Sequence, residues 1–324
     1  MFDRFERLKE ILQVGAIEEK LAGDGITNLI LIPHRDLHRF PIHVLFSGEF
    51  AISYLPSFRV GINLKQRFTP PSINSILSIE NPDSVIIDEK GQQKRFPPLP
   101  AAEIESEIIC RMFANSTRRA DTTATLDEVT TLLQQQHNFF HFTGHGSYNF
   151  ENPLESALYL NHTDKLTVKE IIDLNLSNYK LIYLSACETA VTEKQTILAE
   201  YVGLTSGFMR AGVGCAVSTL WPVESGASTL LTIDFYRRWL EGGDTIPAAL
   251  ANSQKWLRNA TREDLAAWYQ REIDKISENS SKLSEVEIIL IDSLATDRLA
   301  LATMEFDRPY EHPYYWAAFT VTGI

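Results

Sequence analysis

The sequence predicts an α/β sandwich whose central sheet is mainly parallel. Between about residue 101 and residue 259, apolar strand-like runs alternate with segments whose apolar residues recur at helical spacing, as in chains built from β–α–β units. Hydrophobic residues make up 44% of the 324 residues and charged residues 22%, which is typical of a soluble globular protein. No internal repeat with a period of about 20 to 50 residues is present, which excludes a solenoid.

The first 100 residues predict a helical lead-in and three strands. Residues 1–25 place apolar side chains at helical spacing among many charges, which predicts an amphipathic lead-in. Residues 28–33 are a continuous apolar run ended by proline, which predicts a strand buried on both faces of a parallel sheet. Residues 51–55 and 76–79 predict further strands, separated by loops rich in Pro, Ser and Asn.

The rest of the chain predicts the alternating layers and one insertion. Residues 261–308 are charged and helix-prone, and they predict an inserted helical pair or lid. Residues 314–321 are aromatic and β-branched enough to form a last strand. The other predicted elements are helices from about residue 101, over 125–135, 167–174 and 199–211 and twice between 228 and 259, and strands over 138–142, 180–185 and 214–220.

Charge and cysteine content narrow the class of protein. The net charge of −12, from 42 acidic and 30 basic residues, argues against a nucleic-acid surface, because phosphate binding calls for clustered Lys and Arg. No stretch approaches the ~20 consecutive apolar residues of a membrane span, and the N-terminus is too charged for a signal peptide. A cytoplasmic protein without nucleic-acid or membrane partners is expected. Three cysteines at wide spacing suit free thiols better than a disulfide framework.

Two predicted strands end in small residues around one reactive side chain. The run 139–144 leads into His145 and Gly146, and the run 181–186 leads into Cys187. Sites in parallel sheets are built beyond the carboxyl ends of the strands, so neighbouring strands would bring the histidine and the cysteine together. The imidazole would take the thiol proton, and the thiolate would attack an amide carbon. The backbone N–H groups of Gly146 and Cys187 are the predicted donors to the developing oxyanion.

Other interpretations are available for several of these side chains. A cysteine at a strand end is also explained as a small buried hydrophobe, and residue type alone leaves this alternative open for Cys187. Cys110, in an amphipathic helix, and Cys215, inside an apolar strand, are expected to be structural. His141 lies on the same strand as His145, and we expect it to be a hydrogen-bonded core residue rather than the base.

Three further histidines do not predict a metal site. His34, His38 and His43 are loosely spaced around two prolines, and no cysteine pair joins them. No metal is therefore expected, and a His–Cys dyad needs no cofactor.

The motifs around these residues resemble those of the CHAT domain family, a caspase-like family related to separase and often found beside tetratricopeptide repeats. The resemblance runs nearly end to end and keeps the family's order. It is carried by Leu29-Ile30-Leu31-Ile32-Pro33, Pro98-Leu99-Pro100, His141-Phe142-Thr143-Gly144-His145-Gly146, Leu184-Ser185-Ala186-Cys187-Glu188-Thr189, Ser218-Thr219-Leu220-Trp221-Pro222-Val223 and His312-Pro313-Tyr314-Tyr315-Trp316-Ala317-Ala318-Phe319.

The resemblance implies a caspase-like three-layer α/β sandwich in which His145 and Cys187 form a catalytic dyad. On this basis we expect a peptidase domain over residues 26–324 after the lead-in 1–25, with the helical insertion at about 261–308. It also implies regulation by partners, with a tetratricopeptide-repeat protein or region as the expected regulator.

The pocket for the P1 side chain, which precedes the scissile bond, departs from the family pattern. The family and separase usually carry an acidic residue two positions after the valine of the Leu-Trp-x-Val motif, and separase-like enzymes associate it with a basic P1 side chain. This chain has Ser225 there, with Glu224 just before it. A one-residue shift along an extended segment turns a side chain to the opposite face. Glu224 and Ser225 are the candidate pocket residues, and a preference for Arg or Lys does not follow.

Three functions fit these residues. The first is a cysteine endopeptidase that cleaves protein or peptide substrates with Cys187 as nucleophile and His145 as general base. The second is a caspase-like interaction or scaffold module in which the dyad is silent. The third is acyl transfer or amidase action on a small molecule, with the same dyad in a closed pocket. Complete motifs around both residues favour the first.

Overall fold

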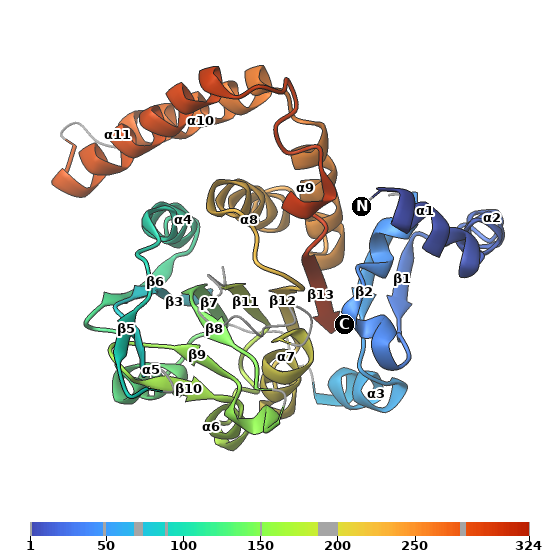
Figure 1. Ribbon diagram of the computed structural model, residues 1–324, viewed down its shortest axis with the longest axis horizontal. Coiled ribbons are helices and arrows are strands. Elements are labelled where there is room, and N and C mark those ends of the chain that lie inside the picture. Colours follow the sequence, from blue (N-terminus) through green and yellow to red (C-terminus); the bar gives the residue numbers. More distant parts are fainter. Residues whose placement is uncertain are drawn as a thin grey trace.

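The central sheet carries helices on both faces, which confirms the predicted fold class. The computed structural model describes residues 2–47, 50–67, 74–87, 90–149, 151–186, 200–278 and 283–323. Within them an eight-stranded sheet has the order β1-β2-β13-β12-β11-β7-β3-β6 (Figure 1). The last five strands of this order run parallel to one another, whereas β13, β2 and β1 run the opposite way.

The large sheet is accompanied by two small ones. The large sheet consists of β1 (Asn28–Leu31), β2 (Ala51–Tyr54), β3 (Ser75–Pro82), β6 (Asn115–Asp121), β7 (Phe139–Gly144), β11 (Leu181–Ala186), β12 (Cys215–Thr219) and β13 (Phe319–Gly323). The small sheets consist of β8 (Gly146–Ser147), β9 (Ala157–Tyr159) and β10 (Lys165–Thr167), and of β4 (Val85–Ile87) and β5 (Gln93–Arg95).

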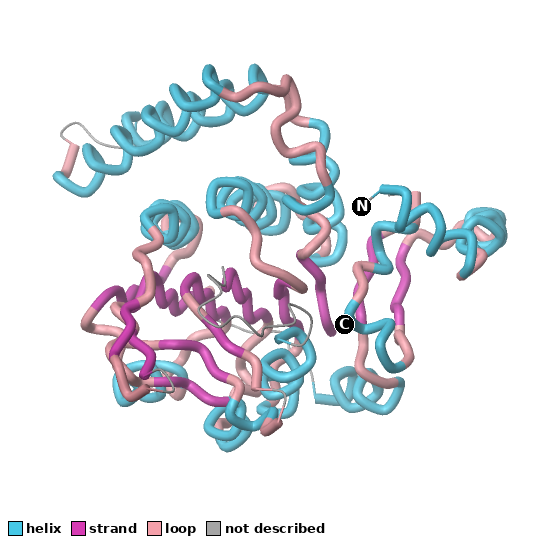
Figure 2. Tube along the Cα trace, viewed as in Figure 1, coloured by secondary structure: helices cyan, strands magenta, loops and turns pink. Residues whose placement is uncertain are grey.

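Helices form the two outer layers, as the tube in Figure 2 shows. One layer is α4 (Pro100–Cys110), α8 (Ser225–Leu240) and α9 (Ile246–Asn259), and the other is α5 (Leu126–Leu133), α6 (Val168–Asp173) and α7 (Glu200–Ala211). The remaining helices are α1 (Phe2–Ile11), α2 (Val14–Gly23), α3 (Phe58–Arg67), α10 (Arg262–Glu278) and α11 (Glu285–Ala300), with 3-10 turns η1 (Arg35–Arg39), η2 (Ile42–Leu45), η3 (Pro153–Glu155), η4 (Leu301–Thr303) and η5 (Pro313–Tyr315).

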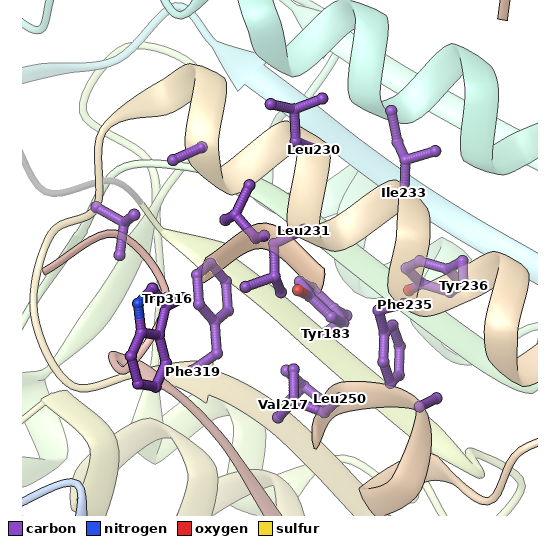
Figure 3. Close-up of a cluster of buried hydrophobic side chains, with 14 of the residues drawn as sticks. Tyr183, Val217, Leu230, Leu231, Ile233, Phe235, Tyr236, Leu250, Trp316 and Phe319 are labelled. Atoms are coloured by element: carbon purple, nitrogen blue, oxygen red, sulfur yellow. The ribbon is translucent and has the colours of Figure 1, made fainter. Parts of the chain in front are cut away.

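Alternating side chains of the central strands supply both hydrophobic cores. Tyr183 of β11 and Val217 of β12 point toward Leu231 and Phe235 of α8 (Figure 3). On each strand, the residues next to these face the opposite layer of helices, because successive side chains of a strand alternate between the two faces. That second core includes Phe140, Phe142, Ile182, Leu184 and Ala216.

The prediction that residues 28–33 form a strand buried on both faces is wrong. β1 covers Asn28–Leu31 and is an edge strand, which among the described residues pairs with β2 alone. Ile30 is 53% exposed and Ile32 is 45% exposed. An apolar run marks a strand, but whether helices cover both of its faces depends on its place in the sheet.

Other differences from the sequence-based expectations are local. The lead-in forms two helices, α1 and α2, and the stretch after β2, expected to be a loop, contains the helix α3. Leu64 of α3 packs with Leu55 and Met209, a tertiary contact that stabilises the helix. The last strand begins at Phe319, later than predicted, because η5 and a turn over residues 316–318 occupy the preceding residues.

The insertion predicted at about 261–308 contains two helices. α10 and α11 run against each other as a hairpin, here called the arm (residues 262–300). The arm projects from the α8 and α9 layer and passes over α4 (Figure 1). Of the helices in the described part of the chain, none combines the length and the apolar character that crossing a membrane requires.

Candidate active site

The two strands that carry the predicted dyad end side by side. β7 and β11 are parallel neighbours whose register runs from Phe139 opposite Leu181 to Gly144 opposite Ala186. Adjacent strands of a sheet lie about 4.8 Å apart, so the chain leaves both strands at the same level. His145 is the next residue after β7. Cys187 is the next residue after Ala186 in the sequence, and it lies outside the described residues.

The end of β7 is closely packed around Gly144. A Cβ atom built on Gly144 would lie 2.7 Å from Cζ of Phe142 and 3.1 Å from Cδ of Pro82. Both distances are shorter than an ordinary carbon–carbon contact of about 3.5 Å or more. A glycine is therefore required directly before His145, and this requirement explains part of the Thr-Gly-His-Gly sequence.

His145 is buried and held by the segment that precedes α4. Its side chain is 1% exposed, and its ring stacks on the Phe96 ring, with centroids 4.5 Å apart and planes inclined by 17°. Nε2 of His145 lies 3.0 Å from the carbonyl oxygen of Pro97. A carbonyl only accepts hydrogen bonds, so Nε2 donates and carries the proton of the neutral ring. Nδ1 is then the basic nitrogen.

The segment that holds His145 is itself anchored. The Phe96 N–H donates to the carbonyl oxygen of Ser84 (3.0 Å), and the Leu99 N–H donates to Oδ1 of Asn81 (2.9 Å). Asn81 has a φ of 41°, in the left-handed region that Asn tolerates better than most residues. The Phe96 ring also packs against Tyr159, at a centroid distance of 4.8 Å. β3, the 96–99 segment and β9 thus enclose the imidazole.

Gly146, one of the two predicted oxyanion donors, pairs with β9 in a way that directs its N–H away from that strand. The Tyr159 N–H donates to the carbonyl oxygen of His145 (2.8 Å), while Gly146 lies opposite Leu158. In an antiparallel pair this pattern makes Gly146 and Leu158 a non-hydrogen-bonded pair. The Gly146 N–H therefore points to the other side of β8.

The candidate pocket residues begin α8 at the same edge of the sheet. β12 is parallel to β11 and adjacent to it, so its carboxyl end opens on the same edge as Ala186. Glu224 is the N-cap of α8, and its carboxylate accepts hydrogen bonds from the N–H groups of Gly226 (3.0 Å) and Ala227 (2.8 Å). Its negative charge is favourable beside the helix N-terminus. Ser225 is the first residue of the helix.

The other two cysteines are buried. Cys110 is 5% exposed and Cys215 is 3% exposed. Burial raises the pKa of each thiol to about 12, because the thiolate loses hydration in apolar surroundings. Both thiols are protonated at neutral pH and are poor nucleophiles, which agrees with the structural roles expected for them.

His141 lies deeper in the sheet than His145 and has different neighbours. Its side chain is fully buried, Nε2 lies 3.1 Å from Oε1 of Glu105 on α4, and Nδ1 lies 3.4 Å from the Tyr236 hydroxyl on α8. These contacts agree with the hydrogen-bonded core residue expected from the sequence. β7 ends at Gly144, so the alternation of the strand does not extend to His145.

The histidines near the N-terminus serve other contacts. Nδ1 of His43 lies 2.9 Å from the Tyr54 hydroxyl, which also accepts a hydrogen bond from the His43 N–H. In the described part of the chain, no group of three or more His, Cys, Asp or Glu side chains is arranged to hold a metal ion.

Sequence reasoning missed the residues that orient His145. The Pro97 contact is made by a backbone carbonyl, which leaves no side-chain signature. Phe96 and Asn81 lie about 50 or more positions from His145 in the sequence, and only the sheet order brings them together. The Pro-rich segment around Pro97 marked a loop, but its sequence carried no sign of a contact with a histidine.

A mainly parallel sheet between two helical layers, with a buried histidine at the carboxyl end of a central strand, defines a caspase-like α/β fold. The structure is similar to that of the Arg-specific cysteine proteinase gingipain R (RgpB), with a TM-score of 0.55, 12% identity and coverage of 95% of this chain and 66% of the proteinase chain. It is also similar to Saccharomyces cerevisiae separase in its complex with securin, with a TM-score of 0.48, 17% identity and coverage of 71% and 14%.

The family follows from the sequence match. The profile of the CHAT domain family matches residues 4–324, so the chain belongs to the CHAT domain family. A curated relative, tetratricopeptide repeat protein 28 of Mus musculus, is 36% identical over 77 residues, which are 24% of this chain and 3% of that protein. The chain thus spans less than two thirds of the length of each of these three proteins.

Proposed function

We propose that this protein is a cysteine endopeptidase with Cys187 as nucleophile and His145 as general base. One observation carries the proposal: the shared register of β7 and β11 sets Gly144 opposite Ala186, the residues directly before His145 and Cys187 in the sequence. The fixed orientation of the imidazole supports the same roles, because a general base must hold its basic nitrogen toward the nucleophile. Family membership adds to both.

The reaction follows from these roles. His145 Nδ1 accepts the thiol proton while the Cys187 sulfur attacks the carbonyl carbon of the scissile peptide. The imidazolium then gives this proton to the leaving amine, and a thioester to Cys187 remains. Water deprotonated by His145 hydrolyses the thioester and restores the thiol. The N–H groups of Gly146 and Cys187 donate to the oxyanion of both tetrahedral intermediates.

Glu224 and Ser225 belong to the P1 pocket in this proposal. The Glu224 carboxylate is exposed and already accepts two backbone hydrogen bonds, and its outer lone pairs can accept hydrogen bonds from a polar or basic P1 side chain. Cleavage of a peptide library would define the preference. A clear preference for an acidic P1 residue would contradict the role of Glu224.

Regulation by a tetratricopeptide-repeat protein or region is part of the proposal. It rests on family membership and on the match to a protein named for these repeats. Adding such a partner is expected to raise the rate of peptide cleavage. A rate unchanged by any repeat partner that binds the chain would contradict it.

Labelling of the cysteines by iodoacetamide tests the dyad. We expect selective modification of Cys187, mapped by peptide mass spectrometry, and much slower modification in the variant His145→Ala. Cys110 and Cys215 serve as internal controls, because their thiols are buried and their pKa values are raised. Equal, slow labelling of all three cysteines, together with no peptide cleavage above that of the Cys187→Ser variant, would favour the scaffold function instead.

A further inference from the structure

A cavity lies on the side of the molecule where the N-terminal segment meets α9. Its volume is about 450 Å³, and it is lined by residues of α1, 43–47, 50–54, α9 and β13. Its volume falls within the roughly 300 to 1,000 Å³ of small-molecule sites. In the sheet, β12 and β11 separate β13 from β7, so this cavity is distinct from the surroundings of His145. We call it the α9 cavity.

The charged side chains that line the α9 cavity are three cationic ones and one carboxylate, that of Glu6. Lys255 and Arg258 lie one turn apart on α9, and the Arg258 guanidinium lies over the Trp316 ring, 5.5 Å from its centroid. Among the described residues, neither forms an ion pair with a carboxylate. Lys9 also lines the cavity and pairs with Glu18 (3.2 Å). This positive rim occurs in a chain whose net charge is −12.

Hydrogen bonds hold the part of the α9 cavity wall that Trp316 and Phe319 form. Nε2 of Gln254 donates to the carbonyl oxygens of Trp316 and Phe319, both at 2.9 Å. These bonds hold the indole ring of Trp316 and the start of β13 without help from a ligand. Leu250 adds apolar surface. His43 also lines the cavity, and burial lowers its pKa to about 3, so its ring is neutral and does not add to the positive charge.

We propose that the α9 cavity binds an apolar, preferably aromatic, group that carries a carboxylate. The carboxylate would lie between Arg258 and Lys255, which supply charge-assisted hydrogen bonds, and the apolar body would pack on Trp316, Val44 and Phe46. Stacking of Arg258 on Trp316 pre-orients the guanidinium and reduces the entropy lost on binding. A free aromatic acid and the C-terminal residue of a peptide share this chemistry.

Calorimetric titration of the whole chain separates these two sources. The probes are indole-3-propionate, as the free acid, and the tetrapeptide Gly-Gly-Gly-Phe, with a free C-terminus; indole-3-propionamide and the C-terminally amidated peptide are the controls that lack the carboxylate. Binding of the peptide alone assigns the cavity to peptide C-termini, and binding of the free acid alone assigns it to a small molecule. We expect each binding acid to exceed its amide in affinity by about tenfold or more, the usual effect of losing a hydrogen bond to a charged group.

Two variants place the binding in the α9 cavity. Arg258→Gln removes the charge, and Ala251→Phe fills the cavity from α9; each is expected to weaken binding about tenfold or more. Arg59→Gln, at an exposed position on α3, is the matched control and should bind like wild type. Arg258→Gln keeps the test valid if Ala251→Phe does not fold, as judged by circular dichroism. The proposal is overturned if neither acid binds at about 5 mM, if acid and amide bind equally, or if Arg258→Gln binds as tightly as wild type.

Discussion

Backbone groups and one aromatic ring set the chemistry of His145. The Pro97 carbonyl accepts a hydrogen bond from the Nε2–H group, which leaves Nδ1 as the basic nitrogen, and the Phe96 ring fixes the plane of the imidazole. A catalytic base acts well only in a narrow range of orientations. Phe96, which has no chemistry of its own, is therefore a positioning residue in the proposed peptidase.

Replacing the ring while keeping an apolar side chain tests this role. Phe96→Leu removes the stacking contact with His145, and we expect the rate of Cys187 labelling to fall by about tenfold, while the free energy of unfolding falls by less than about 1.5 kcal/mol. Phe58→Leu, on a ring that is 72% exposed, should change neither. Loss of labelling in both variants would show that the effect does not depend on the imidazole.

Replacing two glycines by alanine distinguishes a steric requirement at Gly144 from an effect of helix propensity at Gly15. A Cβ at Gly144 meets the Phe142 ring at 2.7 Å, whereas a Cβ at Gly15 in α2 meets nothing within 4 Å. Gly144→Ala should lower the free energy of unfolding by about 1 to 3 kcal/mol, and Gly15→Ala should raise it by about 0.5 to 1 kcal/mol. Urea unfolding of both variants measures the difference, and equal effects would rule out the close packing at the end of β7.

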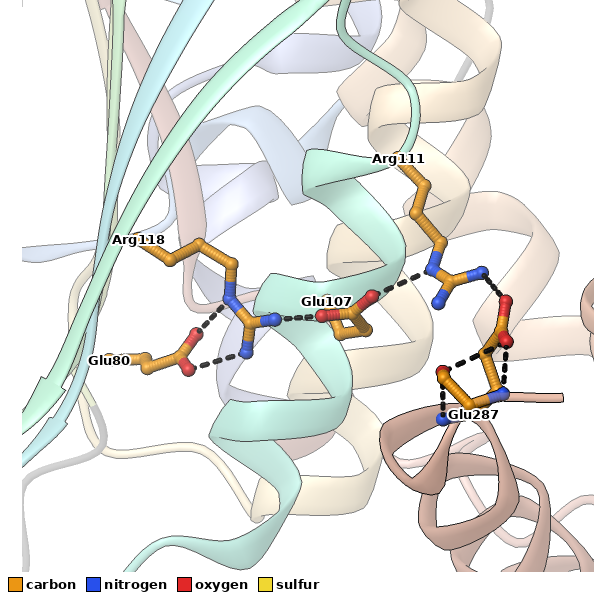
Figure 4. Close-up of polar contacts among 6 residues, drawn as sticks. Glu80, Glu107, Arg111, Arg118 and Glu287 are labelled. Carbon is orange, nitrogen blue, oxygen red and sulfur yellow. Dashed lines mark hydrogen bonds and ion pairs between the residues drawn. The ribbon is translucent and has the colours of Figure 1, made fainter.

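At the scale of elements, a row of alternating charges joins the arm to the sheet. Glu80 of β3 pairs with Arg118 of β6, Arg118 with Glu107 of α4, Glu107 with Arg111, and Arg111 with Glu287 in the first turn of α11 (Figure 4). The contact at the sheet end is the more buried one: the Glu80 side chain is 4% exposed and that of Arg118 26%, whereas at the arm end the Arg111 side chain is 34% exposed and that of Glu287 13%. Ion pairs gain strength as they lose solvent, and a buried charge left unpaired is costly.

Removing the charge of Arg118, next to Glu80, or that of Arg111, next to Glu287, should therefore have unequal effects on stability. Arg118→Met leaves the buried Glu80 carboxylate without its partner, and we expect a loss of about 3 kcal/mol in the free energy of unfolding. Arg111→Met removes the exposed contact with Glu287, and the loss should stay below about 1 kcal/mol. Guanidinium chloride would screen these charges, so urea is the denaturant of choice. A greater loss of unfolding free energy for Arg111→Met than for Arg118→Met would contradict this dependence on burial.

At the scale of the whole molecule, two buried groups link folding to pH in opposite directions. Burial lowers the pKa of His43 to about 3, from 6.5, so its contribution is complete above pH 6.5 and is lost as the pH falls toward 3. Burial raises the pKa of Glu272 to about 7, from 4.5, against the opposing effect of Arg237. The contribution of Glu272 is complete below pH 4.5 and is lost as the pH rises toward 7.

The two contributions oppose each other between pH 4.5 and 6.5, and single substitutions should reveal each one. Relative to wild type, His43→Gln should lose stability as the pH rises through this window, and Glu272→Gln should gain it, each by at most about 1.4 kcal/mol per pH unit. Urea unfolding at constant ionic strength across the window checks both slopes. Curves that stay parallel to that of wild type would rule out the linkage.

The sequence by itself determined the layered α/β class and the two strands that lead into His145 and Cys187. The runs before His145 and Cys187 are largely apolar and end in small residues. Such a local pattern predicts a buried strand without knowledge of its neighbours in the fold. The arm was likewise visible as charged, helix-prone sequence. The edge position of β1 and the helix α3 were not predicted, because place in the sheet and packing against Leu55 are not properties of the segments themselves.

Only the tertiary structure decided which groups surround His145 and which groups meet at the α9 cavity. Register between β7 and β11 is a non-local property that depends on the packing of both faces, and it sets Gly144 opposite Ala186. The Pro97 carbonyl at His145 and the Arg258 guanidinium over Trp316 join residues 48 and 58 positions apart. Neither contact follows from periodicity or residue type, because each forms between segments that only the folded chain brings together.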